Sequence, residues 1–165
     1  MEFELLERKF KLLNNYELFS LYKKGNSKTE KLYKINLTLK KDGYQKFNFT
    51  VKGKTKTFQF HRVVYYANYP NWNIYDSSKN NCIDHIDRIR TNNHISNLRV
   101  VTNQENQFNK NSKGYFLRKR TGKYEAKINL NGKYIYIGSF DTPEEAHQAY
   151  LNKKDELHII QIRTH

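Results

Sequence analysis

IDHIDRIRTNNHISNLRVVTNQENQFN, residues 83–109, is the stretch around which the rest of the chain is organised. It opens with the pair Asp84-His85, passes through a loop rich in asparagine, and continues into a short apolar run. Thr102 and Glu105 then have the spacing of a capping box, which predicts a helix that begins at Thr102. The predicted order is therefore strand, loop, strand, helix. Because side chains alternate along a strand, we expect a bend that brings Asp84 and His85 to one site.

The polar residues of this stretch suit the hydrolysis of a phosphodiester. A hard divalent ion prefers oxygen ligands and keeps several waters, so one or two protein donors are enough to hold it. Asp84 offers a carboxylate oxygen, and Asn106, just past the first turn of the predicted helix, offers an amide oxygen. His85 has the side chain best suited to take a proton from water near neutral pH. Asp87 could be a supporting carboxylate or only a turn former.

The chain before this stretch contains a hairpin and a short helix. Apolar and polar residues alternate on both sides of Lys52-Gly53, which predicts a hairpin with one buried aromatic face. We expect Lys46, Lys54 and Lys56 on the opposite face. The segment 61–69 is predicted to be a helix that Pro70 stops. Residues 1–40 give a mixed signal that is compatible with helix or strand.

The chain after this stretch has the pattern of a small sheet covered by one helix. Strands are predicted at 115–120, 124–130 and 133–140, and Asn131-Gly132 is a typical two-residue hairpin turn between the last two. Thr142, Pro143 and Glu145 then mark the start of a helix. Together with the segments before it, this gives an α+β fold class. We expect two domains, 1–112, with its core at about 43–110, and 113–165.

The charge of the chain favours a polyanionic partner. The formal net charge is +14 over 165 residues, with most of the excess in the two flanks of the central stretch. Such a charge favours nucleic acid, or less well an anionic membrane surface. No apolar run approaches the roughly 20 residues that span a bilayer. The single cysteine, Cys82, permits no internal disulfide, so we expect an intracellular setting. We also expect a monomer with no membrane association.

The motif of the central stretch resembles that of HNH nucleases, most closely those of homing endonucleases encoded by phages and introns. The matching residues are Asp84-His85, Asn92-Asn93, Asn97-Leu98-Arg99, Val101-Thr102 and Glu105-Asn106. The resemblance implies a ββα-metal core with one Mg²⁺ or Mn²⁺ ion, with Asp84 and Asn106 as ligands, His85 as general base, and Asn97 bracing the loop and helping to orient the histidine. It also implies phosphate contact or structural support for His61, Arg62 and Arg99. The sequence departs from the family at Arg88-Ile89, where Gly-Asn is common, so the turn there must differ.

The segment from about Lys113 to His158 resembles the AP2-type DNA-binding domain. The matching residues include Gly114-Tyr115, Arg120 to Tyr124, Asn131-Gly132-Lys133, Ile137 to Thr142 and Glu144-Glu145-Ala146. The resemblance implies a three-stranded antiparallel sheet on one helix, with the sheet in the major groove of double-stranded DNA. The candidate contacts are Arg118, Arg120, Lys123, Lys127 and Lys133. Tyr134 is a further candidate, and Tyr124 could equally belong to the core.

The interpretation that unites these features is a metal-dependent DNA endonuclease, in the manner of a homing endonuclease. The alternative from another class is a non-catalytic DNA-binding regulator that uses the C-terminal sheet. An RNA-binding protein is a third possibility, although no RNA-specific stacking motif stands out.

Overall fold

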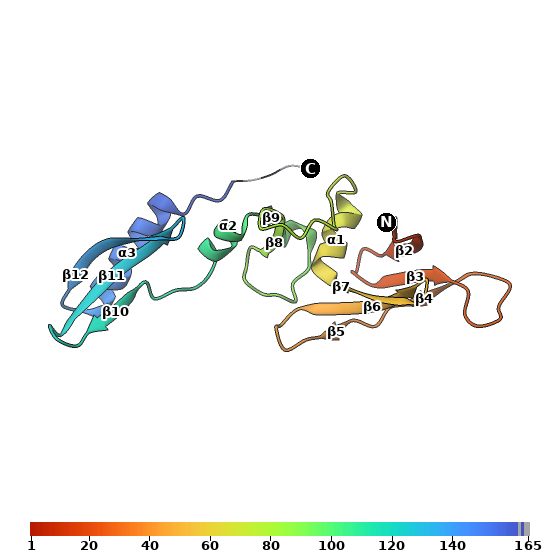
Figure 1. The fold of residues 1–165 in the computed structure, drawn as a ribbon, viewed down its shortest axis with the longest axis horizontal. Helices are drawn as coiled ribbons and strands as arrows, with labels where there is room; N and C mark the ends of the chain where they lie inside the picture. Colours follow the sequence, from red (N-terminus) through yellow and green to blue (C-terminus); the bar gives the residue numbers. More distant parts are fainter. Residues whose placement is uncertain (162, 164–165) are drawn as a thin grey trace. The chain divides into compact units, whose positions relative to one another are not determined.

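The computed structural model describes residues 1–161 and residue 163, and it divides the chain into two compact units. The first unit comprises residues 1–100 with Arg163, and the second begins at Val101. The strands and helices of both are drawn in Figure 1. The boundary between the compact units falls inside the central stretch, whereas the domain boundary expected at 112/113 stays a prediction.

The N-terminal residues form a four-stranded antiparallel sheet. Its strands are β1 (Glu2–Leu5), β2 (Arg8–Leu12), β3 (Leu18–Tyr22) and β4 (Lys31–Lys34), in that spatial order. Leu6 and Glu7 both have positive φ, which allows a two-residue turn between β1 and β2. Because Phe10 and Leu12 lie two residues apart on β2, both reach the core, and both are buried.

The predicted aromatic hairpin is present as part of a three-stranded sheet. It consists of β5 (Thr38–Leu39), β6 (Gln45–Val51) and β7 (Lys54–Gln59), with β6 in the middle. Phe49 lies opposite Lys56, and Val51 lies opposite Lys54. Residues directly opposite each other point to the same side of a sheet, so Lys54 and Lys56 share the aromatic face. Their predicted place beside Lys46 is therefore wrong.

A helix and a second pair of strands complete the first unit. The helix α1 (Phe60–Asn68) ends before Pro70, as predicted, and packs against β6 and β7. The strands β8 (Cys82–His85) and β9 (Leu98–Val101) form a two-stranded sheet, and the short 3₁₀ helix η1 (Ile95–Asn97) precedes β9. Side chains from these elements and from β1, β2, β3, β6 and β7 form one hydrophobic core.

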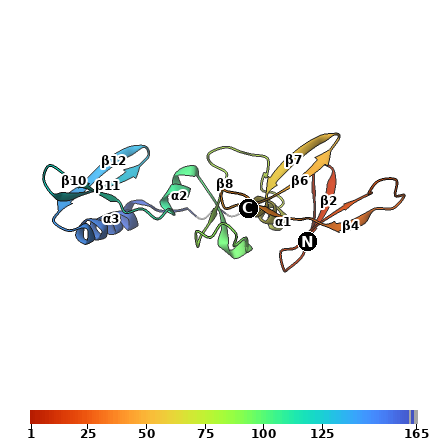
Figure 2. The same ribbon diagram turned by 90° about the horizontal axis from the view of Figure 1, so that it is seen from below.

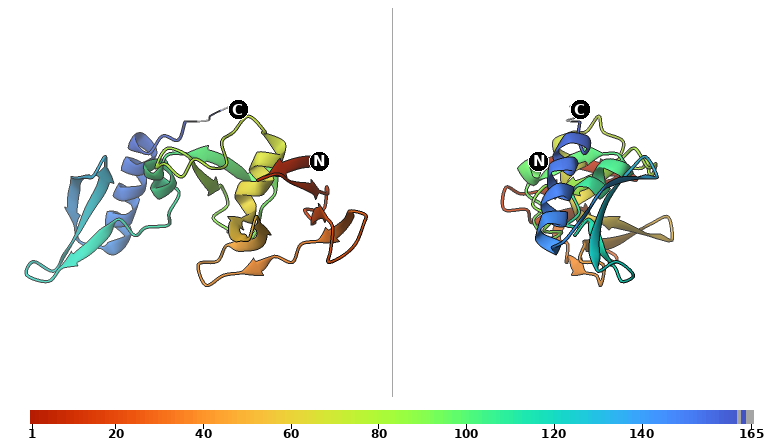
Figure 3. Two further views of the ribbon diagram at one scale, coloured as in Figure 1. Left: turned by 45° about the vertical axis from the view of Figure 1, so that its right-hand side comes forward. Right: turned by 90° about the vertical axis from the view of Figure 1, so that its left-hand side faces the viewer.

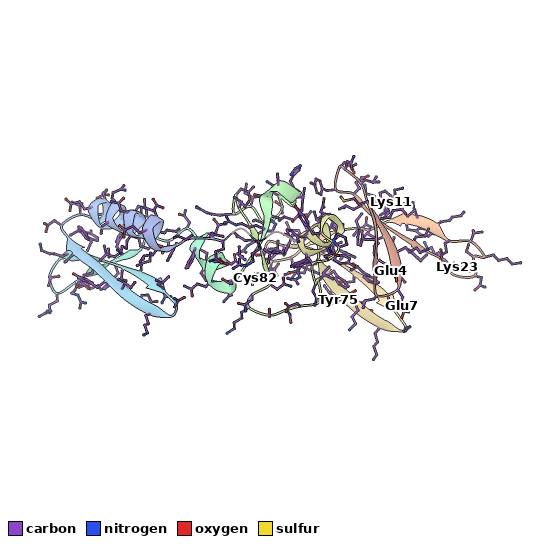
Figure 4. The ribbon with its side chains drawn as sticks, turned by 90° about the horizontal axis from the view of Figure 1, so that it is seen from above. Glu4, Glu7, Lys11, Lys23, Tyr75 and Cys82 are labelled. Carbon is purple, nitrogen blue, oxygen red and sulfur yellow. The ribbon has the colours of Figure 1, made fainter. Side chains whose placement is uncertain are left out.

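The long loop 70–81, between α1 and β8, is held by side chains at both of its ends. Asn81 donates to the carbonyls of Asn73 and Asp76, both at 2.9 Å, and accepts from the indole N–H of Trp72. Figure 4 labels Cys82, the residue at which β8 begins, and Tyr75, whose hydroxyl accepts a hydrogen bond from the Leu6 N–H at 3.3 Å. The loop therefore has a fixed path and delivers β8 to a defined place in the first unit.

The second unit contains two helices and an antiparallel sheet. The helices are α2 (Asn103–Phe108) and α3 (Pro143–Leu157), and the sheet has the order β10 (Tyr115–Arg118), β11 (Lys123–Leu130) and β12 (Lys133–Phe140). Both predicted capping boxes are present, at Thr102 and at Thr142. Figures 2 and 3 show α3 lying along one face of the sheet, where Ala146 and Tyr150 are buried.

The whole arrangement is a mixed α and β fold with several small sheets and few helices. Among the described residues, no helix is long and apolar enough to cross a membrane. The likeness of the C-terminal sheet and helix to an AP2 domain stays a prediction.

Candidate active site

Asp84 and His85 are the last two residues of β8, and both are buried, with exposed fractions of 5% and 4%. The Arg88 N–H donates to the His85 carbonyl at 2.9 Å, so the chain turns as soon as the strand ends. The turn therefore starts at His85, whereas we expected a bend that brings Asp84 and His85 together. The two side chains contact different partners, as the alternation of a strand requires.

Asp84 forms an ion pair with Arg99 of the neighbouring strand. Its Oδ2 accepts from Arg99 Nε at 3.0 Å and from Nη2 at 2.8 Å. Two donors on one oxygen fix the orientation of the carboxylate. The contact favours structural support for Arg99, and its alternative role in phosphate contact stays a prediction.

His85 lies among aromatic rings and amides. The ring of His61 packs edge-on at 5.1 Å between centroids, and the ring of Tyr44 lies at 6.0 Å. Nε2 of His85 is 3.1 Å from Oδ1 of Asn93, a buried residue of the loop. Burial, with repulsion from His85 and Arg62, lowers the pKa of His61 from 6.5 to about 3, so His61 packs against His85 as an uncharged ring.

Asn97 joins the two ends of the loop that separates β8 from β9. Its Oδ1 accepts from the Asp87 N–H at 3.0 Å, and its Nδ2 donates to Asp87 Oδ1 at 2.9 Å and to the Asn92 carbonyl at 2.8 Å. Its own carbonyl accepts from the Ile86 N–H at 2.9 Å. These four hydrogen bonds are what a loop-bracing asparagine needs, while any part of Asn97 in catalysis stays a prediction.

Asp87 is the centre of the turn that departs from the family pattern. Its carboxylate accepts from Asn92, from Asn97 and from the Ile89 N–H. Desolvation acts to raise the pKa of Asp87, but these hydrogen bonds together hold it below its ordinary value. Arg88 has a φ of +67°, in the left-handed region that favours glycine, so this backbone conformation occurs although the residue is arginine. Of the two roles considered for Asp87, its contacts are those of a turn former.

Asn106 lies in α2, in the second compact unit, and its side chain is half-buried. The Thr102 capping box fixes the start of that helix, and the Asn106 N–H donates to the Thr102 carbonyl at 2.9 Å. A carboxylate oxygen such as that of Asp84 and an amide oxygen such as that of Asn106 are ligands that a hard divalent ion accepts, and their joint role as metal ligands stays a prediction. Within residues 1–161 and 163, no cluster of three or more His, Cys, Asp or Glu side chains could hold a metal.

The two residues before this site that we considered for DNA contact, His61 and Arg62, have inward-facing environments. His61 is only 4% exposed. The Arg62 guanidinium donates to the carbonyls of Ile74, Asp76 and Asn81, each at 2.9 Å, and stacks over the Trp72 ring at 4.7 Å. These contacts favour structural support, the other role considered for the pair.

The cations of the C-terminal sheet, by contrast, are solvent-exposed. Arg118 forms an ion pair with Glu125, and Lys123 forms one with Asp141 at 3.0 Å. Surface pairs of this kind are weak and easily exchanged. Arg120 and Lys133 are also exposed.

Lys127 lies between two rings on the same face. Its ammonium group is 4.9 Å from the centre of the Phe116 ring and 4.5 Å from that of Tyr134, which is 69% exposed. Tyr124 is half-buried against Tyr115, which favours a place in the core for it. Lys127 and Tyr134 are therefore the candidates that combine charge and stacking surface.

Three residues that position the site were not singled out from the sequence. Asn93 contacts His85, and Gln45 of β6 accepts from Asn93 Nδ2 at 2.7 Å. Tyr16 has a φ of +62°, and its hydroxyl accepts from the Ile95 N–H at 3.0 Å. Asn93 is one of the residues that match the HNH motif, so the motif itself indicated a place near the site. Gln45 and Tyr16 are 48 and 79 residues from their partners, and no local pattern indicates such contacts.

Comparison with known proteins finds sequence similarity in the central segment. Residues 58–108 match the family model described as HNH endonuclease. One uncharacterized HNH endonuclease of Acanthamoeba polyphaga mimivirus is 41% identical over 80 residues, which is 46% of this chain and 42% of that protein. A second from the same virus is 31% identical over 132 residues, or 78% of this chain and 36% of that protein.

The central segment is thus similar to HNH endonucleases. The chain spans less than half the length of these two relatives. It is also similar to the HNH homing endonuclease I-HmuI, in a structure of DNA binding and cleavage by that enzyme. That similarity has a TM-score of 0.40 and 26% identity, and it covers 62% of this chain and 55% of the other.

Proposed function

We propose that this chain is a metal-dependent endonuclease that hydrolyses phosphodiester bonds in double-stranded DNA. The observation that carries the proposal is the pair Asp84-His85 at the end of a buried strand, each side chain held by its own partner, inside the HNH segment. A buried and fixed arrangement of this kind is what general-base chemistry needs.

In the proposed reaction, His85 takes a proton from the attacking water. Asp84 and Asn106 would hold one Mg²⁺ or Mn²⁺ ion, which when bound offsets the charge of the phosphate and stabilises the leaving 3′ oxygen. Arg99 keeps the Asp84 carboxylate oriented, and Asn97 keeps the loop after His85 closed. The expected products carry 3′-hydroxyl and 5′-phosphate ends.

DNA recognition in this proposal belongs to the exposed face of the C-terminal sheet. Lys127 carries exposed positive charge on this face, and Arg120, in the turn before β11, and Lys133, at the start of β12, carry more beside it. The whole chain has a net charge of +14. Contacts of these cations with phosphates would make binding weaken steeply with salt. Action as a homing endonuclease rests on the resemblance in sequence, and the monomeric state and intracellular setting stay predictions. One active centre in a monomer would nick one strand.

The decisive experiment incubates the full chain with supercoiled plasmid in the presence of Mg²⁺, Mn²⁺ or a chelator. We expect nicked plasmid with either metal and none with the chelator. His85→Ala should lower the rate on the order of 10²- to 10⁴-fold. The matched control is His147→Ala, which removes a histidine from α3 and should keep the wild-type rate.

Two outcomes would contradict the proposal. The wild type could leave the plasmid intact with every metal while still binding duplex DNA, which would favour the non-catalytic DNA-binding regulator. Alternatively, His85→Ala could cut as fast as the wild type. Competition between duplex DNA and single-stranded RNA in a binding assay distinguishes the endonuclease and the DNA-binding regulator from an RNA-binding protein.

A further inference from the structure

The side chain of Asn93 connects the proposed general base to a strand outside the HNH loop. Asn93 is 6% exposed, and its carboxamide has three contacts. Nδ2 lies 2.7 Å from Oε1 of Gln45 and 3.2 Å from the carbonyl oxygen of Thr91, and Oδ1 lies 3.1 Å from Nε2 of His85. All three partners belong to the first compact unit.

The chemistry of these contacts fixes which way the Asn93 amide points. The Thr91 carbonyl can only accept, so the group that faces it must be the NH₂ of Asn93. The second hydrogen of this NH₂ is directed at Gln45, which presents its oxygen. Exchanging the oxygen and nitrogen of Asn93 would set two oxygens against each other at Thr91 and again at Gln45. Oδ1 of Asn93 therefore faces His85.

The orientation of Asn93 in turn determines the tautomer of His85. An amide oxygen only accepts hydrogen bonds, so Nε2 of His85 has to carry a proton to complete the 3.1 Å contact. In a neutral imidazole, the other nitrogen then carries the basic lone pair. The rings of His61 and Tyr44 pack beside the imidazole, and they limit its rotation.

We propose that Asn93, supported by Gln45, is a positioning residue that holds His85 as its Nε2–H tautomer and so makes Nδ1 the atom that takes the proton from water. The inference rests on the function proposed above. It assigns different roles to two asparagines. Asn97 holds the two ends of the loop through Asp87 and Asn92, and Asn93 orients the imidazole. It also makes β6 part of the active centre, because Gln45 is its first residue.

The test combines a spectroscopic and a kinetic readout on the full chain without metal and with Mg²⁺. Long-range ¹H–¹⁵N spectra of the ¹⁵N-labelled protein, at a pH where the ring is neutral, report which ring nitrogen is protonated. The His85→Ala spectrum assigns the His85 signals by their loss. We expect the Nε2–H form in the wild type. Asn93→Leu should give a mixture of tautomers and should slow plasmid nicking on the order of 10²-fold.

Conservative variants distinguish positioning from a merely structural role. Asn93→Asp keeps an acceptor oxygen toward Nε2 and should retain the Nε2–H tautomer. Its second oxygen would face the Thr91 carbonyl in place of the NH₂ group, so it should recover only part of the rate. Gln45→Glu keeps an oxygen toward Asn93 and should resemble the wild type, whereas Gln45→Met should resemble Asn93→Leu more weakly. Asn92→Leu is the matched control, because Asn92 is the neighbouring asparagine and donates to Asp87. It should leave the His85 tautomer unchanged.

Each remaining outcome counts for or against the proposal. An Nδ1–H tautomer in the wild type, or an unchanged tautomer in Asn93→Leu, would overturn it. If Asn93→Leu does not fold, the comparison of Gln45→Met with Gln45→Glu decides, and equal tautomers in that pair would overturn it. A wild type that shows the Nε2–H form but cuts no DNA would sink the proposed endonuclease function while leaving the positioning of the ring established.

Discussion

The candidate active site and the exposed face of the C-terminal sheet use polar residues in opposite ways. Asp84, His85, Asn93 and Asn97 are each less than a tenth exposed, and each is held by a hydrogen bond from or to a neighbour. On the sheet formed by β10 to β12, the cations and the ring of Tyr134 are open to solvent. Proton transfer requires atoms fixed within a fraction of an ångström, whereas a phosphate backbone can be held by mobile cations. Burial therefore separates the residues proposed for chemistry from those proposed for recognition.

The largest expected effect is that of a substitution that destabilises the C-terminal sheet and leaves the candidate active site intact. Gly114 has a φ of +72°, and a Cβ there would lie 1.9 Å from Cγ of Tyr150, a buried residue of α3. Gly114→Ala should therefore destabilise the second unit by about 4 kcal/mol, from the clash and the backbone strain together. Hydrogen exchange measured by mass spectrometry should show lost protection at residues 115–157 and unchanged protection in β6 and α1.

Gly122→Ala is the matched control for this substitution. Gly122 has nearly the same φ, +70°, but nothing lies within 4 Å of the Cβ position. Only the left-handed strain remains, which costs about 1–2 kcal/mol. Equal destabilisation by the two variants would contradict the packing of Gly114 on Tyr150. Equal loss of protection in both units after Gly114→Ala would contradict their independence.

A smaller effect on the free energy of unfolding is expected from substituting two arginines, Arg62 and Arg120, both of which the sequence suggested as candidates for DNA contact. Arg62→Ala would leave three carbonyls without their charged donor and should lower the free energy of unfolding by about 2–4 kcal/mol. Arg120→Ala removes an exposed side chain and should change it by less than about 0.5 kcal/mol. Urea unfolding followed by Trp72 fluorescence measures the first effect, and circular dichroism measures the second.

The same two variants should reverse their order in DNA binding. Arg120→Ala should reduce the slope of log affinity against log salt by about 0.9, the value for one phosphate contact. Arg62→Ala should leave that slope unchanged at temperatures where the protein is folded. If Arg62→Ala reduced the slope of log affinity against log salt without lowering the stability, Arg62 would be a phosphate contact. Buried and exposed cations would then not differ in the way proposed.

The sequence predicted the parts of the fold that depend on local chemistry. The turns at Lys52-Gly53 and Asn131-Gly132, the helix before Pro70, and both capping boxes are present where they were expected. Each depends on residues within about four positions of one another, so a single stretch contains the whole signal. The place of Asp84 and His85 at the end of a strand was predicted for the same reason.

The features that the sequence did not predict depend on partners far along the chain. The spacing of Phe3, Leu5 and Phe10 is compatible with a helix, whereas these residues lie on β1 and β2, which pair with each other, and β2 pairs further with β3. The wrong face for Lys54 and Lys56 came from counting them with the polar residues instead of following the alternation from Phe58. The contact of Gln45 with Asn93 joins residues 48 positions apart, and only the tertiary fold reveals it.

The last prediction concerns the pH dependence of stability, and it compares His61, the buried neighbour of His85 inside the site, with a histidine outside the site. The pKa of His61 is about 3 in the folded protein against an ordinary value of 6.5, so the unfolded chain binds more protons between these two values. Its contribution to stability is complete above pH 6.5 and is lost as the pH falls toward 3. The slope should approach 1.4 kcal/mol per pH unit near pH 5, because one proton separates the two states.

Urea unfolding at pH 7, 6, 5 and 4 measures this slope in the wild type and in His61→Phe, where the contribution should vanish. The matched control is His147→Ala, which should keep the wild-type slope because His147 is only half-buried on α3. An equal slope in His61→Phe and wild type would show that His61 is protonated in the folded protein, and the site around His85 would then contain a buried positive charge instead of a neutral ring.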